Sequence, residues 1–189
     1  MFLQSVLKVL LFRLSGAEDL IVGTPVSGRN HPDLEGQIGC YINLLPLRSK
    51  LSANISFTDF LKGESERVLD ALNHQDYPFD LLVGEVRQDR ELSRSPLFEV
   101  LIALLKSGDL GFHLPGIKTE NIDAAASFSR YDLSFYFEEK AGRYELALEY
   151  DTVLFSEMRV RRMWKYFQSL LTAIIEEPNQ TIGSLALMN

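Results

Sequence analysis

The fold of this chain is decided by two neighbouring stretches, Tyr131-Asp-Leu-Ser-Phe-Tyr-Phe-Glu138 and Tyr144-Glu-Leu-Ala-Leu-Glu-Tyr150. In each stretch, large apolar residues alternate with polar or small ones, and this period of two is typical of a strand with one buried face. Lys140-Ala-Gly142 lies between the two stretches and is short enough to turn the chain back on itself. We therefore predict a β-hairpin over residues 131–150 with one apolar face.

The rest of the chain adds further elements around this hairpin. Short apolar runs bounded by Gly, Pro and Asn predict buried strands at 20–27 and 38–48, and the run 96–105 is typical of a central strand or a buried helical turn. Apolar residues at three- and four-residue steps predict helices at 2–14, 56–73, 78–87 and 157–175. Because helices and strands do not alternate strictly along the chain, we predict an α+β fold, a mixed sheet with helices packed mainly on one face.

The composition is that of one globular unit of 189 residues, 46% of them hydrophobic and 24% charged. Twenty-six acidic and nineteen basic side chains leave a formal net charge of −7, which opposes binding to nucleic acid. No run reaches the roughly 18 apolar residues of a membrane span, and Lys8 and Arg13 interrupt the apolar beginning of the chain. We therefore expect a soluble, cytoplasmic protein that binds neither nucleic acid nor membranes.

Few residues are arranged for metal binding or nucleophilic catalysis. Cys40 is the single cysteine and lies in the predicted buried strand 38–48, and the three histidines have no ligand-like spacing. Gly23 and Gly28 have the spacing of a phosphate-binding loop, but Arg29 follows where that loop needs a lysine. We therefore expect no disulfide, no metal site and no directly bound cofactor.

Two polar clusters have a structural explanation and a functional one. His74 and Asp76 are two residues apart, and residues at that spacing do not face each other on a helix, so a histidine bound to helix-end carbonyls is favoured over an acid–base pair. Four basic residues crowd the last predicted helix, and a solvated face explains them better than an acidic partner does. They are Arg159, Arg161, Arg162 and Lys165.

Several stretches, in this order, resemble motifs of the C-terminal half of nonribosomal peptide synthetase condensation domains. They are Asp19-Leu-Ile-Val-Gly-Thr-Pro-Val-Ser-Gly-Arg29, Ile38-Gly-Cys-Tyr-Ile-Asn-Leu-Leu-Pro-Leu-Arg48, Asn73-His-Gln-Asp-Tyr-Pro-Phe-Asp80, Arg90-Glu-Leu-Ser-Arg-Ser-Pro-Leu-Phe98 and Tyr131-Asp-Leu-Ser134. The third is similar, almost letter for letter, to the family's His-Gln-Asp-x-Pro-Phe-(Glu/Asp) motif. The family's catalytic His-His-x-x-x-Asp-Gly motif does not occur in this sequence.

This resemblance implies a fold, an activity and partners. The fold would be one chloramphenicol-acetyltransferase-like lobe over residues 1–189, the C-terminal half of a domain that forms amide bonds between carrier-bound aminoacyl or peptidyl thioesters. The partners would be the N-terminal lobe and peptidyl carrier proteins, which carry the substrates on phosphopantetheine. Because the histidine motif is absent, we expect the chain alone to be inactive, and its exposed lobe face could support a homodimer.

The resemblance also assigns supporting residues, none of them catalytic. Arg29 would pair with the aspartate of the absent motif, and Asn43 would lie near the tunnel wall, available to hydrogen-bond substrate. Arg94 and Pro96 would be architectural, and the weakly patterned stretch 111–129 would supply the strand that crosses to the other lobe. The residues expected to shape the lobe junction are His74, Asp76, Pro78 and Phe79.

Two other functions remain open at this stage. Epimerisation and heterocyclisation domains share the same lobes, although the asparagine of Cys40-Tyr-Ile-Asn-Leu44 and the pair Ser93-Arg94 look more like condensation than epimerisation. The chain could also belong to a non-catalytic, condensation-like module that docks a partner. The sequence of the N-terminal lobe is the observation that separates these functions.

Overall fold

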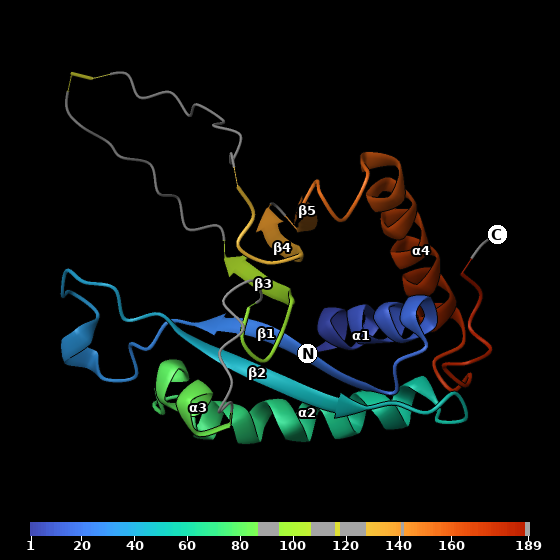
Figure 1. Ribbon diagram of the computed structural model, residues 1–189, viewed down its shortest axis with the longest axis horizontal. Coiled ribbons are helices and arrows are strands. Elements are labelled where there is room, and N and C mark those ends of the chain that lie inside the picture. The colour runs from blue at the N-terminus through green and yellow to red at the C-terminus, as the bar shows by residue number, and fades with distance from the viewer. Residues whose placement is uncertain (87–94, 107–115, 118–127, 141, 188–189) are drawn as a thin grey trace.

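The computed structural model of the protein contains one five-stranded sheet with helices packed against it (Figure 1). The structure describes residues 1–86, 95–106, 116–117, 128–140 and 142–187. Across these ranges, no helix combines the length with the hydropathy that a bilayer-spanning segment needs.

The sheet is mixed, with strand order β2-β1-β3-β4-β5. The central pairs β1–β3 and β3–β4 are parallel, whereas the outer pairs β1–β2 and β4–β5 are antiparallel. The predicted hairpin is confirmed, since Phe135 lies opposite Leu148 in the β4–β5 ladder. The strands are β1 (Asp19–Val26), β2 (Asn43–Lys50), β3 (Val100–Lys106), β4 (Leu133–Lys140) and β5 (Arg143–Tyr150).

The predicted strand 38–48 is wrong in its first half. The ladder between β1 and β2 ends at the pair Val26–Asn43, so residues 38–42 have no strand opposite them. The chain leaves β1 at Gly28, whose φ of 62° is favourable only for glycine, and a side chain there would collide with the Tyr41 carbonyl. Consequently Ile38 and Cys40 are exposed rather than buried.

Helices occupy the predicted regions and cover mainly one face of the sheet. They are α1 (Phe2–Ser15), α2 (Phe57–Asn73), α3 (Phe79–Val86) and α4 (Glu157–Glu176). The Ser56 and Ser156 side chains cap α2 and α4 by accepting from backbone N–H groups three residues on. Buried apolar residues of α1, α2 and α4 belong to the same core cluster as those of the sheet, whereas α3 lies beside β2 (Figure 1).

The centre of this core is aromatic. Phe167 of α4 is fully buried and packs on Phe135, Phe137 and Trp164, with ring centroids 5.6–6.5 Å apart. The apolar side of the hairpin therefore meets the apolar stripe of the last helix, as the two sequence periods require.

A buried ion pair interrupts the apolar core. Lys8 of α1 and Glu64 of α2 are each 1% exposed, and their Nζ and Oε2 atoms are 2.5 Å apart. Lys8 also donates to the Ser49 hydroxyl of β2, while Arg67 binds the other Glu64 oxygen at 2.8 Å. Burial lowers the pKa of Lys8, and the neighbouring Glu64 carboxylate acts in the opposite direction. This network joins two helices to the sheet, and the sequence pattern did not reveal it.

Candidate functional site

The motif residues gather at the end of the sheet where β2 begins and α3 begins. Asn43 is the first residue of β2, and Phe79 is the first residue of α3. Pro78 precedes α3, and its carbonyl accepts from the N–H groups of Leu81 and Leu82. The chain thus brings motifs from distant parts of the sequence to one end of the sheet.

Asn43 is the hydrogen-bonding centre of this region. Its Nδ2 atom donates to the carbonyls of Gln75 and Tyr77, each at 2.8 Å, and its Oδ1 atom accepts from the Phe79 N–H at 3.0 Å. Both amide hydrogens are therefore committed within the lobe. The expectation that Asn43 is available to hydrogen-bond substrate is wrong for its donors, because the side chain holds the turn between α2 and α3.

Phe79 anchors the same turn through apolar contacts. Its ring lies 5.5 Å from that of Phe98, which in turn stacks on Tyr131 at 5.4 Å. Gly23 of β1 makes room for this cluster, since a β-carbon there would come within 2.1 Å of the Phe98 ring. Burial raises the pKa of the Tyr131 hydroxyl, which favours its un-ionised form.

Arg29 organises the loop that connects β1 and β2. Its guanidinium donates to the carbonyls of Leu34 and Gly39 and lies 4.5 Å above the Tyr41 ring. Within the described ranges it has no carboxylate partner. Arg29 therefore holds its own loop, a role that the sequence motif did not predict.

Asp76 and His74 have separate partners and do not act on one another. Asp76 accepts a hydrogen bond of 2.5 Å from the Asn30 side chain, which ties the α2–α3 turn to the β1–β2 loop. His74 ends α2, and its Nδ1 atom lies 2.8 Å from the Asp70 carbonyl oxygen. This is the helix-end contact favoured over an acid–base pair. Both side chains are exposed.

Some of the predicted site residues lie outside the described ranges. Arg94 is one of them, as is most of the stretch 111–129 that was expected to cross to another lobe. Pro96 is described, and its carbonyl accepts from the Phe98 N–H in the turn before β3. Among the described side chains, no group of His, Cys, Asp or Glu is arranged to hold a metal ion.

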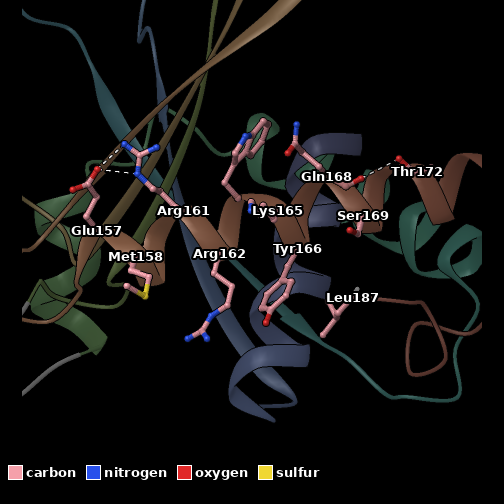
Figure 2. A pocket seen from close by; sticks show the side chains of 11 residues that line it. Glu157, Met158, Arg161, Arg162, Lys165, Tyr166, Gln168, Ser169, Thr172 and Leu187 are labelled. Atoms are coloured by element: carbon pink, nitrogen blue, oxygen red, sulfur yellow. Dashed lines mark hydrogen bonds and ion pairs between the residues drawn. The ribbon is translucent and has the colours of Figure 1, made fainter. Parts of the chain in front are cut away.

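The outer side of α4 forms a second surface, where a groove of ≈ 1240 Å³ runs beside the helix (Figure 2). Arg161 is bound to Glu157 at 2.6 Å, whereas Arg162 and Lys165 have no carboxylate partner in the described part of the chain. Figure 2 shows Arg162 and Tyr166 on the same side of the helix as Leu187. Cationic side chains beside apolar groups can be solvated by water or can bind an acidic partner. Both interpretations of the basic cluster on α4, a solvated face and a binding surface for an acidic partner, therefore remain open.

This arrangement, a mixed sheet with turns and loops held by the motif residues, defines a class of protein, the condensation domains. The sequence profile of the condensation domain matches residues 1–189, and the chain belongs to that family. Its fold is the chloramphenicol-acetyltransferase-like fold of condensation domains. One similar solved structure is the condensation domain of the Monacolin K polyketide synthase MokA, with a TM-score of 0.81 at 22% identity over 96% of this chain and 42% of that chain.

Among the similar proteins are two gramicidin synthases. The whole chain is 40% identical to a stretch that makes up 4% of a linear gramicidin synthase subunit from Brevibacillus parabrevis. It is 34% identical to a stretch that makes up 4% of gramicidin S synthase 2 from Brevibacillus brevis. Another similar structure is the X-domain from teicoplanin biosynthesis, with a TM-score of 0.89 and 26% identity over 98% of this chain and 43% of that chain. The chain therefore spans a small part of the curated relatives that it matches.

Proposed function

We propose that this chain is the C-terminal lobe of a condensation domain that forms amide bonds during nonribosomal peptide synthesis. The observation that carries the proposal is the family match over residues 1–189, together with the ordered motifs of the sequence. The second lobe supplies the His-His-x-x-x-Asp-Gly motif, because this chain has no adjacent histidines. The reaction site then lies between the two lobes.

The chemistry is acyl transfer from a thioester to an amine. The acceptor amine attacks the thioester carbonyl, so the C–N bond forms as the C–S bond breaks, and the thiol leaves with a proton. The motif histidine of the other lobe positions or deprotonates the amine, and holding both substrates together supplies much of the acceleration. The residues of this lobe contribute a shaped wall, through the turn that Asn43 and Phe79 hold.

Arg29 is the residue that we propose to reach across to the second lobe. A guanidinium has five N–H donors, and the Leu34 and Gly39 carbonyls use two of the Arg29 nitrogens. The remaining donors can bind the aspartate of the histidine motif. Ile38 and Ile42 of the same loop are exposed, which suits a surface that packs on another lobe.

The proposed partners are the N-terminal lobe and peptidyl carrier proteins that bring substrates on phosphopantetheine, in the cytoplasm. Without its second lobe, the exposed apolar loop 38–42 can instead pair two copies of this chain. Sedimentation at high concentration tests this homodimer, and a monomer under those conditions would count against it.

Dipeptide synthesis tests the proposed function. The 189-residue chain is incubated with aminoacyl-loaded donor and acceptor carrier proteins, alone and after fusion to an N-terminal condensation-domain lobe that contains the His-His-x-x-x-Asp-Gly motif. We expect product only from the fusion, and none when the second histidine of its motif is replaced by alanine. Turnover by the chain alone would overturn the proposal.

A docking module is the second candidate function. It is favoured by the likeness to the X-domain seen in complex with OxyB, with a TM-score of 0.89 and 25% identity. The two functions differ in the lobe that precedes this one in its full-length protein. An intact histidine motif there, with dipeptide formation by that protein, supports condensation; loss of the motif supports docking. Epimerisation or heterocyclisation would be recognised from the product of the same assay.

A further inference from the structure

The outer face of α4 concentrates positive charge on a chain that is acidic as a whole. Four basic residues lie within positions 159–165, whereas the whole chain has a formal net charge of −7. Among the described residues that line the groove beside this helix, Glu157 is the only acidic one, and it is already bound to Arg161. No described carboxylate forms an ion pair with Arg162 or Lys165. The charge of these two side chains is therefore uncompensated within the described part of the chain.

The spacing of the cations is unfavourable for the helix itself. Arg162 is three residues from both Arg159 and Lys165, and Arg161 is four residues from Lys165. Residues at these spacings are neighbours on a helix, so like charges there repel and destabilise it. The cations also lie in the first half of α4 and not in its last turn, where the helix dipole favours them. Interspersed charges of both signs would hydrate the face equally well, so solvation alone does not account for this arrangement.

Apolar side chains lie beside the cations. Met158 is 79% exposed, and it points to the same side of α4 as Arg162 and Tyr166 (Figure 2). Leu187, from the segment that follows α4, lines the groove on that side. Methionine, tyrosine and arginine are enriched in protein interfaces, where an apolar centre is surrounded by polar and charged groups. The groove therefore combines the two features of such an interface.

Two other classes of anionic partner fit this surface less well. A nucleic acid is repelled at longer range by the net charge of −7, and its phosphates offer no apolar contact to Met158. A membrane binds helices whose apolar face is available for insertion, whereas the apolar stripe of α4 is buried in the core. An acidic protein surface supplies both the negative charge and the apolar contact.

We propose that the groove beside α4 docks an acidic protein surface with an apolar centre, whose carboxylates pair with Arg162 and Lys165 while its apolar side chains cover Met158. This binding goes beyond the proposed function. Asn43, Phe79 and Arg29 do not line the groove, so docking there depends neither on amide formation nor on a second lobe.

Fluorescence of Trp164 measures this docking directly, because Trp164 is the only tryptophan in the chain and lines the groove. The probes are a random copolymer of glutamate and leucine, which supplies charge and apolar groups, and poly-L-glutamate, which supplies charge alone. We expect a saturable change with the copolymer, roughly tenfold weaker binding of poly-L-glutamate, and weaker binding of both as salt screens the charges. Absence of saturation with the copolymer, equal affinity for the two probes, or an affinity independent of salt would overturn the inference.

Charge reversal locates the docking surface. Arg162→Glu combined with Lys165→Glu should weaken binding of the copolymer roughly tenfold or more. The melting temperature should not fall, because the neighbours at 159 and 162, and those at 161 and 165, then carry opposite charges. The matched control is Lys62→Glu combined with Arg143→Glu, two exposed residues outside the groove that change the net charge equally and should leave binding in place. Equal losses in the two double variants would contradict the site.

Other occupants give different results in the same experiments. Double-stranded DNA and phosphatidylserine vesicles are titrated in parallel, and tighter binding of either one than of the copolymer would overturn the choice of an acidic protein. Sedimentation of the chain alone tests a second copy, since a dimer that dissociates in the double variant at 162 and 165 would assign the groove to self-association instead. Dipeptide synthesis by the fusion is measured without these probes, so its failure and a failure of docking are separate results.

Discussion

The two faces of the sheet are held in different ways. On one face, α1, α2 and α4 close a continuous apolar core around Phe167, with the Lys8–Glu64 pair inside it. On the other face, Phe98 packs with Leu101 and Tyr131 in a smaller cluster, against which Phe79 at the beginning of α3 is packed. Of the described motif residues, Phe79 packs against this second cluster, whereas Asn43 and Arg29 hold a turn and a loop at the end of the sheet. The larger buried core lies on the first face, so we expect most of the stability to come from there.

The largest expected effect is on the core face. Phe167→Ala removes a fully buried ring that packs on Phe135, Phe137 and Trp164, and should lower the free energy of unfolding by about 4 kcal/mol. Phe98→Ala, in the smaller cluster on the other face, should lower the free energy of unfolding by less, because the neighbours of Phe98 can relax toward solvent. Urea denaturation of both variants measures the difference. A greater loss for Phe98→Ala would reverse the comparison.

The buried ion pair should come next. Lys8→Met leaves Glu64 with Arg67 alone and should cost about 3 kcal/mol, because a buried carboxylate loses its main partner. Lys8→Met combined with Glu64→Leu should recover most of that loss, since both charges are then removed. A double variant as unstable as the single one would mean that the pair itself, rather than the uncompensated charge, stabilises the core. Urea midpoints decide between these outcomes.

Removing the Asn43 side chain, which holds the turn between α2 and α3, should have a smaller effect. Asn43→Ala breaks three hydrogen bonds and should cost about 2 kcal/mol, with faster hydrogen exchange at residues 75–79 before the core opens. The exposed Asn54→Ala is the matched control and should change neither measurement. Unchanged exchange in the Asn43 variant would show that Phe79 holds the turn without it.

Arg29→Ala distinguishes the stability that Arg29 contributes through contacts in this chain from the stability that it contributes through the proposed second lobe. In this chain the substitution should lower the free energy of unfolding by about 1 kcal/mol, because the loop loses its hydrogen bonds to the Leu34 and Gly39 carbonyls. If Arg29 paired only with another lobe, the stability of this chain would not change. In the two-lobed fusion the loss should be greater by roughly 2 kcal/mol, since a buried carboxylate is left unpaired. Thermal melts of both forms measure it. Equal losses would confine Arg29 to its own lobe.

The smallest effect concerns an exposed pair at the sheet edge. The hydrogen bond from Arg48 holds the pKa of Asp19 below its ordinary value, so the carboxylate stabilises the fold above that value and ceases to do so as pH falls through the lowered pKa. Asp19→Asn should therefore melt slightly below the unchanged chain at neutral pH, and the gap should close in acid. A gap that persists in acid would mean that the pair does not account for it.

The sequence by itself determined the hairpin, the helix stripes and the membership of the family. Periods of two and of 3.6 residues indicate which side chains face the core. These patterns can be identified without knowing which other elements the side chains pack against. The same patterns failed at residues 38–42, where apolar residues predicted a strand. Burial there depends on a ladder that ends at Val26, and no pattern within 38–42 contains that information.

Only the tertiary structure decided what the polar residues do. Asn43 is committed to a turn more than thirty residues away, Lys8 is neutralised by a carboxylate from another helix, and the buried Nε2 atom of Gln4 is left without a hydrogen bond. The physical reason is that hydrogen bonds and ion pairs require two groups to meet at about 3 Å, and that distance is set by how the elements pack. Apolar residues need only reach the core, so their role can be predicted from spacing alone.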